Sequence, residues 1–255
     1  MDDFARQRDF LMTIGPAKRT LIAEIMSSTN PKPKIFLEFG SYVGYSALAL
    51  GSALRDLHPN AKPGEIKYYT FENMPYWAAI TSSLVELAGL KDIVEVVVGD
   101  AAEGLKRLNA EGKLPKGSVD MMLLDHWERF YVPDLQVCED LSILREGTVI
   151  FADNVLAPGA PDYLKYVQVG KAAKSKEELR YATKGIDSIM PNGWKVNPTF
   201  CASLRVNEAD RLAGHSRGDD SREKLIGFYD ERYFVRYYLC ISRFVYARNE
   251  RKLRS

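Results

Sequence analysis

The stretch IFLEFGSYVGYSALAL, residues 35–50, decides the fold. Its first five residues form a compact apolar run of strand length. After a turn with two glycines, apolar residues recur at helical spacing. A buried strand that turns directly into a helix is the first half of a β-α-β unit, so the stretch predicts an α/β protein.

The same alternation continues along the chain. Further apolar runs of strand length occupy residues 66–72, 93–99, 119–125 and 147–153. Segments with helical spacing lie between them, at residues 74–90, 101–108 and 135–144, and a helix with proline in its first turn is expected from Gly15 onward. This order predicts a mostly parallel sheet with helices on both faces.

The chain is expected to form a single domain, residues 1–255. A polar segment rich in turn-forming residues, at about 170–224, is interpreted as an insertion. The aromatic and β-branched segment from Tyr229 to Arg248 predicts one or two strands that finish the sheet in antiparallel orientation.

Composition restricts the partners. Lysine and arginine number 35 against 34 aspartates and glutamates. Such a balance favours small-molecule partners over nucleic acid or a membrane surface. The three cysteines lack the paired spacing of a zinc site, and no apolar run has membrane-spanning length. We therefore expect a cytoplasmic protein, while the oligomeric state stays open.

Glycines and acidic residues follow the first three strands, where ligands bind in open α/β sheets. Gly40 and Gly44 allow a ligand to approach the backbone, although they do not match the dinucleotide fingerprint. Glu72 ends the second strand, where a carboxylate accepts hydrogen bonds from ribose hydroxyls; the alternative is a solvated strand end. Asp100 is a candidate for contact with an adenine amine.

Acidic and amide groups also end the fourth and fifth strands. Asp125 follows one, and Asp153 with Asn154 follows the other. Two carboxylates and an amide oxygen form a hard, incomplete shell that suits Mg²⁺. The alternative is that Asp125 caps a helix and Asp153-Asn154 forms a turn.

Several long motifs resemble the catechol O-methyltransferase family. They include EFGSYVGYSALAL, AGLKDIVEVVVGDA, VDMMLLDHWERFYVPD and LREGTVIFADNVLAPGAPDYL, and the resemblance covers Phe4 to Val167. It implies a Rossmann-like class I methyltransferase fold, an S-adenosylmethionine cofactor, and Mg²⁺ held by Asp125, Asp153 and Asn154. The implied reaction is transfer of a methyl group to a hydroxyl of a catechol-like small aromatic compound.

The resemblance, together with the strand ends, gives a set of expected site residues. The expected cofactor contacts are Met12, Ile14, Glu38, Gly40, Tyr42, Ser46, Glu72, Asn73, Asp100, Ala101, His126 and Trp127. The expected substrate contacts are Phe10, Trp127 and Pro158. Ala101 and Ala102 stand where the family has serine and glutamine, so those polar contacts are absent.

Glu128 occupies the position of the lysine that serves as the family's usual base. Two hypotheses follow. Glu128 accepts the phenolic proton itself, or it points to solvent and catalysis rests on the metal alone or is lost. Pairing of Glu128 with Arg129 would weaken either role. The competing functions are a non-catalytic cofactor-binding homologue and a methyltransferase for another phenol, carboxylate or amine.

Overall fold

The computed structural model describes residues 1–8, 11–169, 179–189 and 236–246. These residues form a seven-stranded sheet of order β3-β2-β1-β4-β5-β7-β6. The first five strands are parallel, and β7 runs antiparallel to both β5 and β6. The strands are β1 (Ile35–Phe39), β2 (Lys67–Glu72), β3 (Val94–Val98), β4 (Val119–Leu124), β5 (Leu144–Ala152), β6 (Leu179–Ile189) and β7 (Arg236–Tyr246). The predicted α/β fold with its five-stranded parallel sheet is confirmed.

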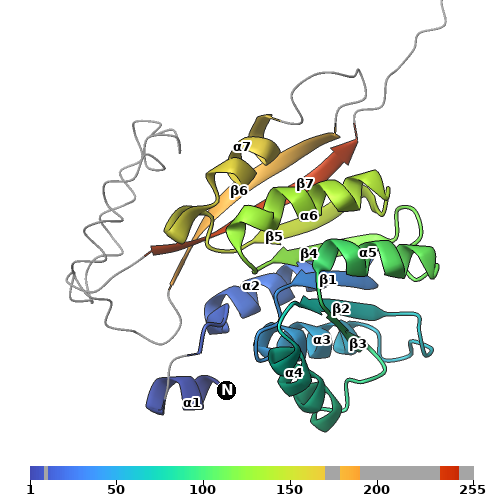
Figure 1. The fold of residues 1–255 in the computed structure, drawn as a ribbon, viewed down its shortest axis with the longest axis vertical. Helices are drawn as coiled ribbons and strands as arrows, with labels where there is room; N and C mark the ends of the chain where they lie inside the picture. Colours follow the sequence, from blue (N-terminus) through green and yellow to red (C-terminus); the bar gives the residue numbers. More distant parts are fainter. Residues whose placement is uncertain (9–10, 170–178, 190–235, 247–255) are drawn as a thin grey trace, which may run out of the picture.

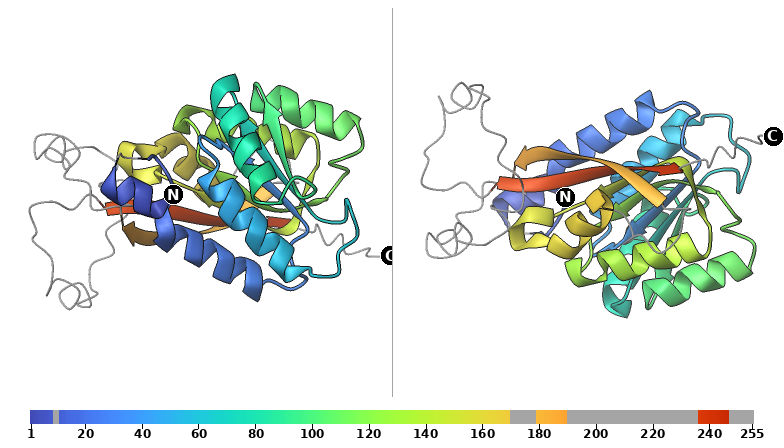
Figure 2. Two further views of the ribbon diagram at one scale, coloured as in Figure 1. Left: turned by 90° about the horizontal axis from the view of Figure 1, so that it is seen from below. Right: turned by 90° about the horizontal axis from the view of Figure 1, so that it is seen from above.

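Helices cover both faces of this sheet, as Figures 1 and 2 show. They are α1 (Asp2–Gln7), α2 (Gly15–Ser28), α3 (Tyr45–Leu57), α4 (Pro75–Leu87), α5 (Ala101–Ala110), α6 (Tyr131–Asp140) and α7 (Pro161–Val169). Short 3₁₀ and π turns occupy Glu128–Phe130 and Val155–Gly159. Among the helices of the described residues, none combines the length and hydropathy that a bilayer span requires.

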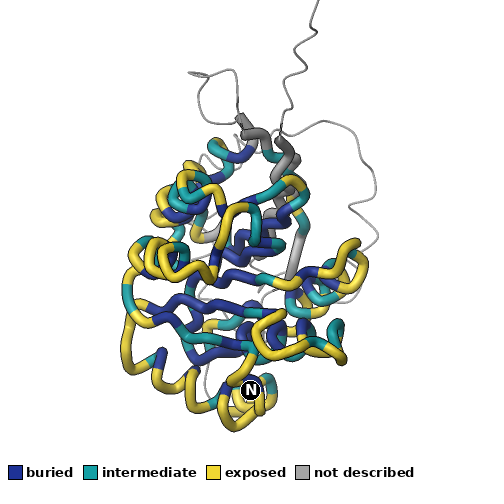
Figure 3. Tube along the Cα trace, turned by 90° about the vertical axis from the view of Figure 1, so that its right-hand side faces the viewer, coloured by how far each residue is buried: buried dark blue, intermediate teal, exposed yellow. Residues whose placement is uncertain are grey.

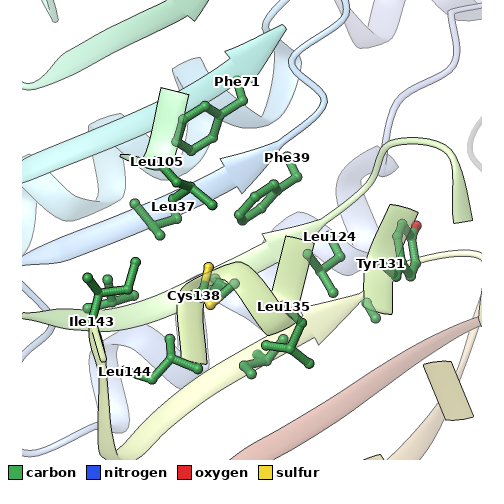
Figure 4. Close-up of a cluster of buried hydrophobic side chains, with 14 of the residues drawn as sticks. Leu37, Phe39, Phe71, Leu105, Leu124, Tyr131, Leu135, Cys138, Ile143 and Leu144 are labelled. Carbon is green, nitrogen blue, oxygen red and sulfur yellow. The ribbon is translucent and has the colours of Figure 1, made fainter. Parts of the chain in front are cut away.

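Alternation along the strands divides the core into two layers. One layer joins the sheet to α5, α6 and α7, and Figure 4 shows part of it, with Phe39 and Phe71 near Leu105 of α5. The other joins the opposite face to α2, α3 and α4 through side chains such as Ile22, Leu50 and Val85. The central strands are therefore buried, while the exposed positions lie mainly on the surrounding helices and loops (Figure 3).

Asp120 ties the strands together at the edge opposite the expected ligand site. Its Oδ2 accepts the backbone N–H groups of Lys34 and Ile35 at 2.7 and 2.9 Å. Its Oδ1 accepts the Arg145 guanidinium, with Nε at 3.0 Å. One carboxylate thus joins β4 to the beginnings of β1 and β5.

The expected helix at residues 135–144 was misplaced. Helix α6 begins at Tyr131 and ends at Asp140, and Leu144 already belongs to β5. Pro133 lies in the first turn of α6, where its missing N–H breaks no helical hydrogen bond. The helix therefore includes Pro133 and begins four residues before the predicted start.

The segment at about 170–224, which was interpreted as an insertion, contains strand β6. Tyr181 of β6 and Tyr166 of α7 both donate hydrogen bonds to the Glu139 carboxylate of α6, the latter at 2.6 Å. This shared acceptor fixes β6 against the helical layer. The remainder of the expected insertion lies outside the described residues.

Candidate functional site

A turn in left-handed backbone conformation connects β1 to α3. Gly40 has φ +95°, and a Cβ at this position would lie 2.6 Å from the Asp125 carbonyl oxygen. Gly44 has φ +81° and forms the N-cap of α3, where a Cβ would lie 2.8 Å from Cγ2 of Thr81. Both glycines are required by conformation and by close packing. Gly40 therefore lets the turn reach the end of β4.

Residues from the next β-α unit hold this turn. The backbone N–H of Tyr42 donates to Glu72 Oε2 at 2.8 Å, and Thr81 Oγ1 donates to the Tyr42 carbonyl at 2.8 Å. Glu72 Oε1 accepts the N–H of Met74 at 2.9 Å. Because a carboxylate oxygen accepts more than one hydrogen bond, Glu72 keeps capacity for ribose hydroxyls while it fixes the turn.

Glu38 lies beneath the turn, and its expected contact with the cofactor stays a prediction. The residue is fully buried in β1, and Thr70 Oγ1 donates to its Oε2 at 2.6 Å. Burial raises the pKa of Glu38 to about 7, although hydrogen bonds from neighbouring side chains oppose the shift. The other carboxyl oxygen, Oε1, is buried and has no hydrogen-bond partner among the described residues.

Asp125 and Asp153 lie side by side at the carboxyl ends of neighbouring strands. The register pairs Leu124 of β4 with Ala152 of β5, and each aspartate is the next residue of its strand. Leu123 of β4 and Phe151 of β5 face the layer formed with α2 and α3. Asp125 and Asp153 lie two residues further along these strands and therefore face the same side. Burial, and then the charge of Asp153, raises the pKa of Asp125 well above its usual value. Two adjacent acidic groups in such surroundings favour a bound cation.

The third predicted ligand, Asn154, adopts φ +55° and precedes the π turn that contains Pro158. Its backbone N–H donates to Asp153 Oδ1 at 2.8 Å. Its side-chain Oδ1 is buried and accepts no hydrogen bond from the described residues. Such an atom lacks the partner that buried polar groups normally have, as expected for a ligand position.

Lys18 belongs to this site, and the sequence analysis missed it. It is buried on α2, and its Nζ forms an ion pair with Asp153 Oδ1. The signal was present in the sequence, because Lys18 shares one helix face with Ile22 and Met26, at positions i, i+4 and i+8. A lysine in line with two core residues is either displaced from the core or paired within it.

Aromatic rings surround the segment after Asp125. The ring of His126 packs against Phe39 and Tyr131, with centroids at 5.5 and 5.2 Å, and its Nε2 lies 2.7 Å from Asp134 Oδ2. The exposed side chain of Trp127 contacts the Arg129 guanidinium, which lies 4.4 Å from the ring centroid. This edge of the sheet therefore offers an apolar wall beside the acidic pair.

Glu128 is half-buried and begins the 3₁₀ turn after Trp127. Its charge contributes to the raised pKa values of Asp125 and Tyr131, which places it in their electrostatic surroundings. The predicted pairing with Arg129 is not observed, because the guanidinium lies over the rings of Trp127 and Phe130. Within the described residues the Glu128 side chain has no hydrogen bond or ion pair, so its carboxylate is available.

The other predicted positions divide into exposed and buried sets. Asp100 is the N-cap of α5 and accepts the N–H of Glu103 at 3.0 Å, so its predicted adenine contact would have to coexist with this capping role. Exposed or half-buried positions are Met12, Asn73, Ala101 and Pro158, whereas Ile14 and Ser46 are buried. Phe10 lies outside the described residues. Their contacts with cofactor and substrate stay predictions.

The donor set fits Mg²⁺ better than a softer metal. In the described part of the chain, no three histidine, cysteine, aspartate or glutamate side chains gather as a metal cluster. The candidate shell instead consists of two carboxylates and the orphaned amide oxygen of Asn154. All three are hard oxygen donors, and their number leaves positions for water or substrate oxygens.

Comparison with known proteins agrees with this fold. Residues 37–155 match the family described as a methyltransferase domain. The O-methyltransferase TomG from Streptomyces achromogenes, solved in complex with SAM, superposes with a TM-score of 0.58 at 15% identity, covering 96% of this chain and 87% of that one. The fold is therefore that of a methyltransferase.

Sequence relatives define the family more closely. Catechol O-methyltransferase of Sus scrofa is 38% identical over 157 residues, which cover 62% of this chain and 78% of the relative. The Bos taurus enzyme is 38% identical over 168 residues, or 66% of this chain and 57% of the relative. The chain belongs to the catechol O-methyltransferase family, and its match spans little more than half of the bovine protein.

Proposed function

We propose that the protein is a Mg²⁺-dependent O-methyltransferase that transfers the methyl group of S-adenosylmethionine to a hydroxyl of a catechol-like small aromatic compound. The observation that carries this proposal is the oxygen cluster of Asp125, Asp153 and Asn154 beside a glycine turn in a member of this family. The neutral overall charge and the aromatic wall near Trp127 support a small, flat substrate.

The cofactor site is built around the turn from Gly40 to Gly44. Its glycines allow close backbone approach, and Glu72 offers its remaining acceptor capacity to the ribose hydroxyls. Trp127 and the ring of His126 provide apolar surface for the adenine and the aromatic substrate. The acidic surroundings also favour a cofactor that carries a positive sulfonium charge.

Asp125, Asp153 and Asn154 would hold Mg²⁺. When bound, the ion supplies Lewis-acid chemistry that lowers the pKa of a substrate hydroxyl and fixes its position. The protein's own contribution is preorganisation. Asp153 is held by Lys18 and by the N–H of Asn154, and the hydroxyl of Tyr131 donates to the Asp153 carbonyl at 3.0 Å. These contacts fix the strand end that presents the ligands.

We further propose that Glu128 accepts the phenolic proton. Its carboxylate has no partner among the described residues, it lies in the electrostatic surroundings of Asp125, and Arg129 is engaged elsewhere. Glu128→Gln removes the base without changing the shape of the side chain. A fall in kcat together with the loss of one limb of the pH–rate profile is expected, and Glu128→Lys should retain activity. An unchanged profile in Glu128→Gln contradicts the assignment.

The function is tested with S-adenosylmethionine, a panel of catechols and monophenols, and Mg²⁺, with and without chelator. We expect turnover of catechols that stops with chelator and returns when Mg²⁺ is restored. Asp153→Asn should lose turnover while it still binds S-adenosylhomocysteine. Cofactor binding without turnover of any catechol or phenol would instead favour a non-catalytic homologue.

A further inference from the structure

The ion pair between Lys18 and Asp153 connects α2 to the end of β5 across 135 positions of sequence. The two side chains are 1% and 4% exposed. An ion pair this deeply buried is weak evidence of stabilisation, because both charges lose their hydration. The presence of this buried pair is therefore better explained by the chemistry of the acidic site, to which Asp153 belongs, than by stability.

Lys18 acts on both aspartates. Within the described residues, the two hydrogen bonds to the Asp153 carboxylate, from Lys18 Nζ and from the Asn154 N–H, both fall on Oδ1. The second oxygen, Oδ2, is thereby left for another ligand. The ammonium also lies near Asp125, because Asp125 and Asp153 follow paired residues of neighbouring strands. One lysine thus offsets part of the repulsion between the two carboxylates.

We propose that Lys18 is the resident counterion of the metal site. It keeps Asp125 and Asp153 assembled when no divalent ion is bound, and it weakens the affinity of the site for that ion. This inference rests on the proposed function, since it takes the two aspartates to be metal ligands. Its consequence is a site that stays folded when empty and exchanges its metal readily.

Two effects determine whether metal affinity rises or falls when the charge of Lys18 is removed. An ammonium close to a bound dication repels it. Removal of the ammonium also leaves a buried carboxylate without compensation, and a divalent ion restores the balance. Both effects make metal binding tighter when the charge of Lys18 is removed. A purely structural role for the lysine predicts the opposite, because a disordered Asp153 would bind metal less well.

The experiment measures Mn²⁺ binding by electron paramagnetic resonance of the free ion, in the full chain without cofactor or substrate. Lys18→Met removes the charge at similar length, and Lys18→Gln also removes it but retains a hydrogen-bond donor. We expect both variants to bind Mn²⁺ roughly tenfold more tightly than the unmodified protein. Lys18→Arg, which keeps the charge, should stay within about threefold of it.

Thermal unfolding gives an independent readout. Without metal, Lys18→Met should melt at a lower temperature than the unmodified protein, and saturating Mn²⁺ should raise its midpoint by more than it raises that of the unmodified protein. The matched control is Lys113→Met, which removes a surface lysine paired with Glu95 and Glu111. It carries the same change in net charge and should leave Mn²⁺ affinity unchanged.

Several results would overturn the inference. Equal or weaker Mn²⁺ binding by both neutral variants contradicts it, as does failure of both variants to fold even with saturating Mn²⁺. A different result contradicts the proposed function: absence of Mn²⁺ binding to the unmodified protein at millimolar concentrations. The two failures are therefore distinguishable in one set of titrations.

Discussion

Glu72 Oε2 accepts the backbone N–H of Tyr42 at 2.8 Å, so the carboxylate at the end of β2 fixes the turn that follows β1. Tyr42 adopts φ +46°, a conformation that few residues other than glycine populate. The proposed ribose acceptor therefore also maintains the left-handed backbone of the turn, and these two roles cannot be changed separately.

The first prediction concerns Glu72→Gln. The amide presents an N–H₂ group to one of the two backbone donors, so either Tyr42 or Met74 loses its acceptor. Loss of a hydrogen bond to a charged group costs about 1.5–3 kcal/mol, so S-adenosylhomocysteine should bind at least ~10-fold more weakly by isothermal titration calorimetry. Glu65→Gln, which removes an exposed surface carboxylate paired with Lys34, is the control. Equal affinities for the two variants would contradict the dual role of Glu72.

The second prediction concerns the pH dependence of stability. Because the pKa of Glu38 is raised from 4.5 to about 7 in the folded protein, the folded state binds more protons than the unfolded state between these values. Stability therefore falls as pH rises through this window, by up to about 3 kcal/mol from this group. The penalty is absent below the unfolded pKa and complete above the folded one.

Glu38→Gln should remove that contribution. In urea unfolding at a series of pH values, the free energy of unfolding of the variant should rise relative to that of the unmodified protein as pH increases from 4.5 to 8. The comparison is made without cofactor or divalent ions, so that unfolding alone is measured. A difference between the two proteins that is independent of pH would show that Glu38 ionises normally.

The third prediction separates conformation from packing at Gly40. Gly40→Ala introduces a Cβ at φ +95° and 2.6 Å from the backbone oxygen of Asp125. The matched control is Gly64→Ala, which has φ +83° and no atom within 4 Å of the new Cβ. For Gly64→Ala we expect the free energy of unfolding to fall by about 1–2 kcal/mol, because of the backbone conformation alone.

For Gly40→Ala the loss should exceed that of Gly64→Ala by about 1–3 kcal/mol, because the backbone must move to relieve the overlap. Cofactor binding should fall at Gly40 and stay unchanged at Gly64. Urea unfolding and calorimetric titration measure the two effects. Equal losses of stability at both glycines would argue against close packing of the turn on β4.

The fourth prediction tests the edge of the sheet remote from the site. Asp120→Ala leaves the N–H groups of Lys34 and Ile35, and the Arg145 guanidinium, without their acceptor. We expect a loss of about 2–4 kcal/mol in unfolding free energy. Asp56→Ala, at an exposed carboxylate, should change stability by less than about 0.5 kcal/mol. Cofactor affinity should survive in Asp120→Ala, and its loss would show that this edge is coupled to the site.

The parallel part of the fold could be predicted because each strand is an apolar run that ends at a polar or glycine residue. The predicted strand at 35–39 matches β1, and the other four differ from the structure by at most three residues at an end. Strand β6 was missed because an antiparallel strand at the edge of a sheet needs few apolar residues. It is attached by pairing with β7, and its Tyr181 also bonds to Glu139, 42 positions away, so both contacts are distant in sequence.

The site was only partly predictable for a similar reason. Asp125, Asp153 and Asn154 follow strands, so topology alone brings them to one edge. Lys18 reaches the same point from helix α2, 135 positions earlier in the sequence, and no local pattern reveals its partner. Sequence position gives the end of the strand that carries Glu38, but it does not give the full burial of this side chain.

The position of α2 has a consequence for anyone who divides this chain into smaller pieces. The segment that matches the methyltransferase domain family, residues 37–155, contains both aspartates of the acidic pair but begins after Lys18. A recombinant fragment cut at those boundaries would leave Asp153 without the cation that it meets in the complete fold. Useful truncations must therefore begin before Gly15.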